Sequence, residues 1–279
     1  MSRAEDWDGV LRVSSCMSEN AEFICQAIAR YIAERLSIPT EFINDIPWQQ
    51  REFLLEVGHI QIGWICALPY VLKVADPLSR LELLAAPVMC GERYHDRPIC
   101  FSDVVVHRES GFQTFADLRG AAWVYNEPGS HSGFNLVGYH LATLGEKSSY
   151  FRRIVESGSH QTSLRMILNR EADFSAIDST VLEIECRRDP GLASAIRLID
   201  TLGPSPSPPF VIQKDLPQAL KRKIQDLLLQ MHTDPQAAQI LDGGVIARFA
   251  SVRDSDYDLI RTMAQLRDAA QLQRNWPPL

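Results

Sequence analysis

With 279 residues, 46% of them hydrophobic and 23% charged, the chain has the composition of a soluble globular protein of one or two domains. Its net charge of −7 and the absence of a basic stripe argue against a nucleic-acid partner. No stretch approaches the roughly 20 apolar residues of a membrane-spanning helix, so we expect no membrane insertion.

The N-terminus and the cysteines bear on the compartment. The first eight residues, Met1 to Asp8, are polar and acidic and lack the apolar core of a signal peptide. The six cysteines show no CxxC spacing, which favours buried thiols over a disulfide framework or a zinc site. The sequence as written therefore predicts a cytoplasmic protein, or a periplasmic or extracellular one if its native signal is missing.

Strand and helix patterns alternate over the first 107 residues. A helix is expected to begin at Ser18 or Asn20, because apolar side chains from Phe23 to Ile32 then fall on one face. The expected strands are 11–15, 41–46, 59–65, 81–89 and 100–107, and the further helices are 49–57 and 67–74.

The alternation continues to the end of the chain, with one linker-like segment, Gly203–Pro209. The expected strands are 121–125, 152–155, 172–177, 196–200 and 210–213. The expected helices are 115–118, 131–144, 160–169, 178–187, 216–231, 235–241 and 255–272. Such repetition predicts mainly parallel sheets with helices on both faces.

The length allows two such sheets, and so an α/β protein of two lobes. We expect lobe 1 to comprise residues 1–105 and 203–279, and lobe 2 to be inserted between them as residues 106–202. The crossings near Val105 and at Leu202–Pro209 would form a hinge, and a ligand would bind in the cleft between the lobes.

The tripeptide Gly-Ser-His occurs twice, at Gly129–His131 and at Gly158–His160. Each copy follows an expected strand and opens an expected helix. The first N–H groups of a helix have no intrahelical acceptor and lie at the positive end of its dipole, which suits an anion. Two such junctions predict a site for a small oxyanion.

The ordered motifs resemble those of the phosphonate- and phosphate-type substrate-binding proteins of ABC transporters, which have the type II periplasmic binding fold. The similarity is best from about Leu83 to Leu220. It rests on these segments, in order: Asp117–Gly120, Glu127–Phe134, Gly158–His160, Ala176–Ser179 and Pro208–Pro217.

The resemblance implies a solute-binding protein rather than an enzyme, with a small anionic ligand, an ABC transporter permease as partner and no cofactor. The family's Ser-Thr-Ser-Gly phosphonate loop matches Ser130, His131, Ser132 and Gly133, so His131 replaces a small hydroxyl residue. The other implied ligand contacts are His160, Asp178, Tyr70 and Tyr94. The sequence as written differs from the family in one further respect: it shows no signal peptide, which a binding protein that works outside the membrane needs.

The implied chemistry agrees with the residue types. Serine hydroxyls and helix N–H groups donate to an oxyanion, and a protonated His160 would add a charge-assisted bond. An ionised Asp178 only accepts, so it would select a ligand that bears a proton or an amine. The competing interpretations are that Asp178 only caps its own helix and that His131 and His160 lie at the surface.

Enzymatic alternatives also exist. Gly129–Gly133 resembles a nucleophile elbow, but His131 stands where that motif needs its serine. Ser130, His160 and Asp178 could form a hydrolytic triad by residue type, although no spacing argument brings them together. His131, His160 and Asp178 could hold a metal ion, which would fit a cytosolic enzyme or sensor on the same fold.

Overall fold

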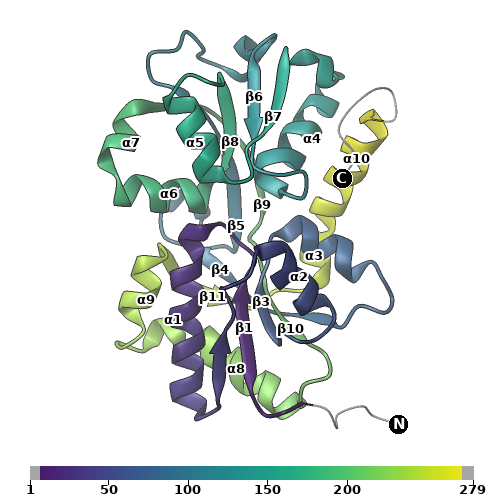
Figure 1. The fold of residues 1–279 in the computed structure, drawn as a ribbon, viewed down its shortest axis with the longest axis vertical. Helices are drawn as coiled ribbons and strands as arrows, with labels where there is room; N and C mark the ends of the chain where they lie inside the picture. The colour runs from purple at the N-terminus through teal and green to yellow at the C-terminus, as the bar shows by residue number, and fades with distance from the viewer. Residues whose placement is uncertain (1–6, 272–279) are drawn as a thin grey trace. The chain divides into compact units, whose positions relative to one another are not determined.

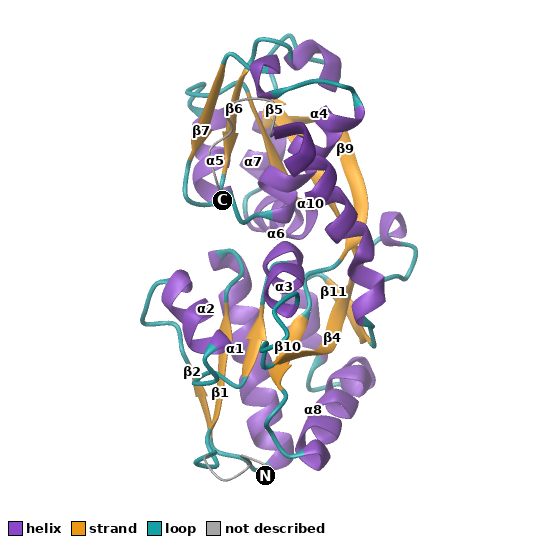
Figure 2. Ribbon diagram, turned by 90° about the vertical axis from the view of Figure 1, so that its right-hand side faces the viewer, coloured by secondary structure: helices purple, strands orange, loops and turns teal. Residues whose placement is uncertain are grey.

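The computed structural model describes residues 7–271, so the expectations that concern residues 1–6 and residue 272 lie outside the described residues. The chain divides into unit 1, Met1–Ile99 with Pro206–Tyr257, and unit 2, Cys100–Ser205 with Asp258–Leu279. Each unit is built on one sheet flanked by helices (Figures 1 and 2). Within the described residues, no helix is long and apolar enough to cross a membrane.

Unit 1 has a six-stranded sheet in the order β11-β4-β10-β3-β1-β2. Its strands are β1 (Leu11–Ser15), β2 (Thr40–Phe42), β3 (Ile62–Trp64), β4 (Leu81–Met89), β10 (Phe210–Gln213) and β11 (Ile246–Ala250). Its helices are α1 (Glu19–Leu36), α2 (Trp48–Glu56), α3 (Ala67–Val74), α8 (Gln218–Gln230) and α9 (Ala238–Gly243). Ser18 precedes α1 as expected, although its side chain makes no capping hydrogen bond.

Unit 2 has a five-stranded sheet in the order β7-β6-β8-β5-β9. Its strands are β5 (Ile99–His107, which begins one residue before the unit boundary), β6 (Ala122–Tyr125), β7 (Arg153–Glu156), β8 (Phe174–Asp178) and β9 (Ile196–Pro206). Its helical segments are two 3-10 turns (Phe115–Leu118 and Ser148–Tyr150), a π-helical turn (His131–Asn135), α4 (Leu136–Thr143), α5 (His160–Leu168), α6 (Ser179–Arg188), α7 (Pro190–Ala195) and α10 (Asp258–Gln271).

The strand directions are more mixed than the sequence predicts. In unit 1, β1 runs parallel to β2 and β3, whereas β10 runs antiparallel to β3 and β4, and β11 runs antiparallel to β4. In unit 2, β6 runs parallel to β7 and β8, but β5 runs antiparallel to β8. Strand–helix alternation signals parallel pairs, but it cannot report the direction of a strand that is added after a long excursion of the chain.

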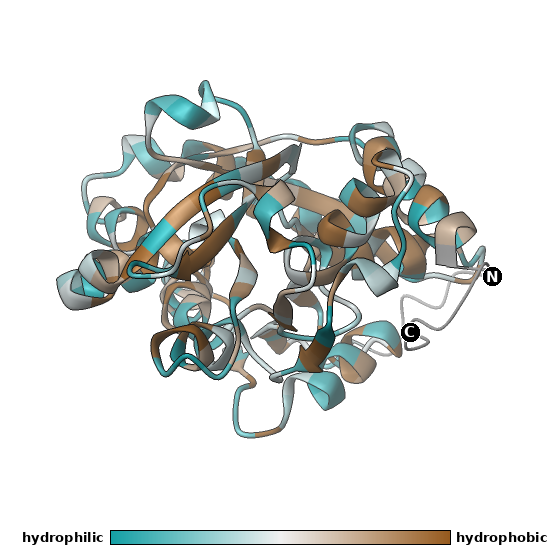
Figure 3. Ribbon diagram, turned by 90° about the horizontal axis from the view of Figure 1, so that it is seen from above, coloured by the Kyte–Doolittle hydropathy of each residue, from teal (hydrophilic) through white to brown (hydrophobic). Residues whose placement is uncertain are grey.

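Alternate residues of β6 contribute to hydrophobic clusters on opposite faces of the unit 2 sheet. Trp123 packs with Phe134, Phe174 and Met263 on the face that α4 and α10 cover, whereas Val124 packs with α5 on the other face (Figure 1). This period of two places a buried apolar row on each side of the strand. In Figure 3 the helices alternate between hydrophobic and hydrophilic colours along their length, as packing on one side requires.

The unit boundaries differ from the predicted division in two respects. The crossings lie at residues 99–100 and 205–206 rather than near 105 and 203. The last helix, α10, belongs to unit 2, although the sequence assigned it to lobe 1. Its side chain Met263 is part of the unit 2 core, and such a long-range contact leaves no local sequence signal.

The expected linker Gly203–Pro209 is wrong in its first half, because β9 extends to Pro206. β9 is an edge strand of the unit 2 sheet, and an edge strand tolerates prolines, which cannot donate to a neighbour. β11 and α7 were not predicted from the sequence. The start of α7 carries a recognisable signal, because Asp189 accepts a capping bond from Gly191 N–H and Pro190 holds the first helical position.

The docking of α10 in unit 2 leads to a stability prediction. Met263 is 5% exposed in the core, whereas Leu266 on the same helix is 48% exposed. We expect Met263→Ala to lower the free energy of unfolding by about 2 kcal/mol, because it leaves a cavity. Leu266→Ala, the control, should cost less than about 0.5 kcal/mol. Urea denaturation measures both, and equal effects would contradict the docking of this helix face.

Candidate functional site

The candidate site lies at the carboxyl-terminal edge of the unit 2 sheet. Because β6 runs parallel to β7 and β8, all three strands end at this edge, and a helical segment begins shortly after each of them. The unpaired N–H groups and the dipoles of these helix starts favour an anion there. We call the following residues the edge site: Asn126, Ser130, His131, Ser132, Gly133, His160 and Asp178.

The segment after β6 opens with a π-helical turn, where the sequence predicted one α-helix over 131–144. Asn135 N–H donates to the Ser130 carbonyl at 3.0 Å, and Leu136 N–H donates to the His131 carbonyl, so both bonds span five residues. Ser130 caps the turn, because its Oγ accepts from Gly133 N–H at 3.0 Å. π-Helical turns inside helices are frequent at functional sites.

Gly133 allows the turn to approach β6 and α5 closely. A Cβ atom at this position would lie 1.9 Å from Asn126 Oδ1 and 3.1 Å from His160 Cε1. Asn126 follows β6 directly, and its carbonyl accepts from Gly158 N–H at 2.8 Å. The lack of a side chain at position 133 therefore lets the turn pack against Asn126 at the end of β6 and His160 at the start of α5, while Asn126 itself connects to Gly158.

Ser132 connects three further parts of the edge site. Its Oγ lies 3.3 Å from His160 Nε2, and its carbonyl accepts from Ser102 Oγ at 2.7 Å. Ser102 is the register partner of Asp178 in the β5–β8 pair. The structure thus brings Ser130, Ser132, Gly133 and His160 together. Asp178 lies on β8 directly opposite Ser102, the residue that donates to the Ser132 carbonyl.

Asp178 caps α6, as one of the competing interpretations predicted. Its Oδ1 accepts from Thr180 N–H at 2.9 Å and from Thr180 Oγ1 at 2.7 Å. Burial raises the pKa of this carboxyl, the hydrogen bonds from Thr180 oppose that rise, and the charge of Asp103 adds to it. A contact between Asp178 and a ligand stays a prediction.

Both histidines of the edge site are buried and neutral at pH 7. Burial, and secondarily the charge of Arg267, lowers the pKa of His131 to about 3, and burial lowers the pKa of His160 to about 4. With exposures of 2% and 3%, neither is the surface residue that the competing interpretation expected. The condition that His160 be protonated is therefore not met in the ligand-free protein near pH 7, and its role as a hydrogen-bond donor to a ligand stays a prediction.

Each ring has one nitrogen close to a polar side chain of the edge region. Asn135 Nδ2 lies 3.0 Å from His131 Nδ1, and the tautomer of the ring sets which of the two nitrogens donates. In His160, Nε2 faces Ser132, while the buried Nδ1 has no hydrogen-bond partner among the described residues. Neutral imidazoles of this kind can donate to an oxyanion without carrying a charge of their own.

Tyr70 and Tyr94 belong to unit 1 and are both buried there. The Tyr70 hydroxyl donates to Asp254 Oδ1 at 2.7 Å, and its ring meets Tyr257 edge-on at a centroid distance of 4.9 Å. Tyr94 lies in a short 3-10 turn, Glu92–Tyr94, with Arg93 over its ring at 5.7 Å. Their role as ligand contacts stays a prediction.

The geometry does not assemble the enzymatic alternatives. The three residues of the possible triad have hydrogen-bond partners outside it: Ser130 contacts Gly133, His160 contacts Ser132, and Asp178 contacts Thr180. Among residues 7–271, no group of three His, Cys, Asp or Glu side chains is placed to hold a metal ion. The His131, His160 and Asp178 metal site is therefore not formed.

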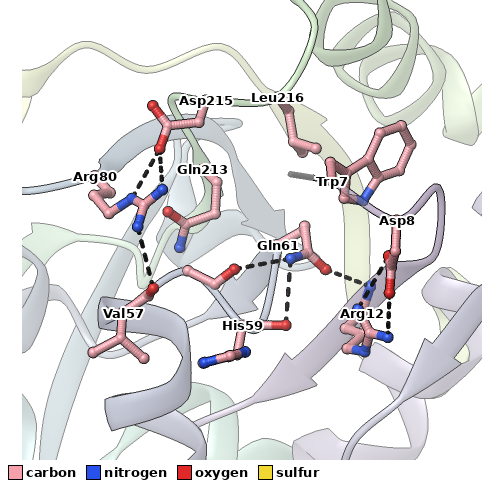
Figure 4. A pocket seen from close by; sticks show the side chains of 11 residues that line it. Trp7, Asp8, Arg12, Val57, His59, Gln61, Arg80, Gln213, Asp215 and Leu216 are labelled. Atoms are coloured by element: carbon pink, nitrogen blue, oxygen red, sulfur yellow. Dashed lines mark hydrogen bonds and ion pairs between the residues drawn. The ribbon is translucent and has the colours of Figure 1, made fainter. Parts of the chain in front are cut away.

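A separate hollow of about 500 Å³ lies in unit 1, beside the amino-terminal ends of β1 and β3 (Figure 4). Its charged side chains pair with one another: Arg12 with Asp8 at 2.7 Å, and Arg80 with Asp215. Gln61 bridges its floor by donating to two backbone carbonyls and accepting from Arg12 N–H. Because its charges are already compensated, this hollow is a weaker candidate than the edge site.

Sequence reasoning missed Asn126, Ser102 and Asn135. Asn126 is the first residue after β6, so its position at a strand end was a usable signal. Asn135 is four residues beyond His131, the spacing at which helical side chains meet. Ser102 lies within an apolar strand, and only the pairing of β5 with β8 places it beside the edge site.

The two α/β units, each built on one sheet flanked by helices, have the type II periplasmic-binding-protein fold. One similar solved structure is a binding protein component of an ABC phosphonate transporter from Pseudomonas aeruginosa, with a TM-score of 0.82, 16% identity and coverage of 96% of this chain and 89% of that one. Another is PhnD1 from Prochlorococcus marinus (MIT 9301) in complex with methylphosphonate, with a TM-score of 0.80, 17% identity and coverage of 92% and 97%.

The chain belongs to the family of phosphonate periplasmic substrate-binding proteins of ABC transporters, whose family model matches residues 14–257. The family consists of solute-binding proteins and not of enzymes. A curated relative, the phosphonates-binding periplasmic protein of Escherichia coli (strain K12), is 24% identical over 183 residues. That match covers 64% of this chain and spans about half, 54%, of the length of the relative.

The close approach at Gly133 predicts a large effect of one methyl group. In Gly133→Ala the added Cβ meets the buried Asn126 side chain, so we expect a loss of about 2 kcal/mol in the free energy of unfolding. Gly129→Ala is the matched control, because a Cβ there meets nothing within 4 Å. Urea denaturation compares the two, and equal stability of both variants would mean that Gly133 has more room than the structure gives it.

The lowered histidine pKa values predict a loss of stability in acid. The unfolded rings bind protons near pH 6.5, whereas the folded rings do so only near pH 4 and pH 3, so acidification favours the unfolded state. Each ring should cost about 2 kcal/mol between pH 7 and pH 5, at about 1.4 kcal/mol per pH unit below 6.5. The raised pKa of Asp178 acts in the opposite direction, and it is common to all variants compared.

Comparison of two variants isolates this effect. His160→Gln should lose about 2 kcal/mol less than the wild type between pH 7 and pH 5, by urea denaturation at each pH. His232→Gln, at an exposed position in unit 1, should keep the wild-type loss. An unchanged loss in His160→Gln would show that His160 is protonated equally in the folded and unfolded states.

Proposed function

We propose that this chain binds a phosphonate, or a related phosphorus oxyanion such as phosphate or phosphite, at the edge site. In this proposal it is the periplasmic solute-binding component of an ABC-type uptake system, with a transporter permease as its partner. The observation that carries the proposal is the convergence of three helix starts, two of them with a Ser-His pair, at one edge of the unit 2 sheet.

The available donors suit an oxyanion. The Ser132 hydroxyl and the His160 ring lie 3.3 Å apart, and both can direct a hydrogen to the same oxygen or to neighbouring oxygens. Hydrogen bonds to a charged acceptor contribute about 1.5–3 kcal/mol each. The first N–H groups of the π-helical turn and of α5 add further donors, and the positive ends of the helix dipoles lie at these same helix starts.

The buried carboxyl of Asp178 supports a preference for a ligand that carries a proton or a donor of its own. An ionised carboxylate beside a fully ionised oxyanion would repel it, and its raised pKa reduces that repulsion at mildly acidic pH. Sulfate stays fully ionised and offers no hydrogen. The proposal therefore includes discrimination of phosphorus oxyanions against sulfate.

A thermal-shift screen followed by calorimetry tests the proposal. The purified chain is mixed with methylphosphonate, aminoethylphosphonate, phosphate, phosphite and sulfate. A ligand at 100 times its dissociation constant stabilises by about 2.7 kcal/mol, so a clear shift with a phosphorus oxyanion and none with sulfate is expected. No shift with any phosphorus oxyanion would refute the proposed function.

The Ser132 hydroxyl should contribute directly to the affinity. Ser132→Ala is expected to weaken binding of the phosphorus oxyanion about tenfold, because one bond to a charged group is lost. Ser149→Ala, at an exposed position in the same unit, should bind like the wild type in the same calorimetric titration. If Ser132→Ala kept full affinity, Ser132 would be removed from the proposed site.

A further inference from the structure

The last helix, α10, buries an arginine in unit 2. Arg267 is 1% exposed, and among the described residues of this unit it is the one lysine or arginine that is buried. Arginine keeps its charge at any physiological pH, and a buried charge lowers stability unless it is compensated. A functional role would account for a buried cation whose burial lowers the stability of the unit.

The partners of Arg267 leave its charge only partly compensated. Its Nε and Nη2 donate to Asp268 Oδ1 at 2.9 Å and 2.7 Å, and the buried Nη1 has no hydrogen-bond partner among the described residues. Asp268 is 52% exposed, so water screens its negative charge more than the positive charge that faces inward. The pair presents its positive end to the interior of unit 2.

This positive end lies behind the edge site. The guanidinium carbon is 5.7 Å from the ring centroid of Phe134, a residue of the π-helical turn His131–Asn135. The same charge reaches His131, which forms the first position of that turn. α10 packs against both the turn and α4, so this arrangement belongs to the packing of the unit.

We infer that Arg267 is a specificity-determining residue of the edge site: its fixed positive charge attracts every anion there, contributes more for a doubly charged anion than for a singly charged one, and so offsets part of the repulsion between Asp178 and a fully ionised ligand. This inference rests on the proposed function, because it names the source of the site's preference for charge. The two histidines are neutral at pH 7 and the chain as a whole carries −7, so neither of them supplies that attraction.

Arg267 also lies outside the part of the chain that the family model matches. That match ends at residue 257, and α10 begins at Asp258. The matched residues include the whole edge site, whereas the charge behind it comes from α10, which follows the matched residues. The affinity for an anion is therefore divided between hydrogen-bond donors within the matched region and a charge beyond it.

Calorimetric titrations at pH 8.5 test the inference with two ligands of different charge, methylphosphonate and its monomethyl ester. In Arg267→Met we expect roughly tenfold weaker binding of methylphosphonate and about threefold weaker binding of the singly charged ester, because the attraction scales with charge. Arg267→Lys should restore most of the affinity. Arg261→Met, on the same helix and ion-paired to Asp258 at 2.7 Å, is the matched control and should bind like the wild type.

Asp268→Asn provides a test of opposite sign at a half-exposed position. Removal of the compensating carboxylate should strengthen methylphosphonate binding a few-fold, while a purely structural role of the pair predicts weaker binding or none. Equal losses for both ligands in Arg267→Met, without rescue by lysine, would overturn the inference and leave the proposed function standing. A wild-type protein that binds no phosphorus oxyanion would overturn both.

Discussion

The parallel pairing of β6 with β7 and β8 is the constraint on which the rest of the site depends. Parallel strands end at the same edge of their sheet, so the three helical segments that follow them start side by side in unit 2. If one of the three strands ran antiparallel to the others, its helix start would lie at the opposite edge. The direction of the strands therefore brings the helix starts together, and the side chains then add their donors to this edge.

Close packing then fixes the donors relative to one another. Gly133 lets the π-helical turn approach Asn126 and His160, and Ser102 from β5 holds the Ser132 carbonyl at 2.7 Å. The same packing removes water from the two histidines and keeps them neutral, which is the physical cause of their lowered pKa values. The site thus consists of neutral donors in fixed positions, with a buried charge on α10 behind them.

Much of the local structure could be predicted from the sequence. The elements Leu11–Ser15, Ala67–Val74, Leu81–Met89, Phe115–Leu118 and Phe210–Gln213 have the predicted bounds, because each has a strong apolar pattern between clear turn residues. The repeated Gly-Ser-His motif identified both helix starts, and Ser130 and Ser159 cap them as serine commonly does. The resemblance to phosphonate-binding proteins was carried by the same ordered motifs, and the family is confirmed.

Neighbouring residues in the chain encode the position of most strands, the serine caps at Ser130 and Ser159 and the recurrence of serine and histidine at two strand ends, so these features could be predicted from the sequence. The burial and neutrality of the histidines, the place of Asn126 and Ser102 in the site and the packing of α10 in unit 2 could not. These features depend on contacts between residues far apart in sequence. Burial, and with it the protonation of a side chain, is set by the neighbours that the fold supplies.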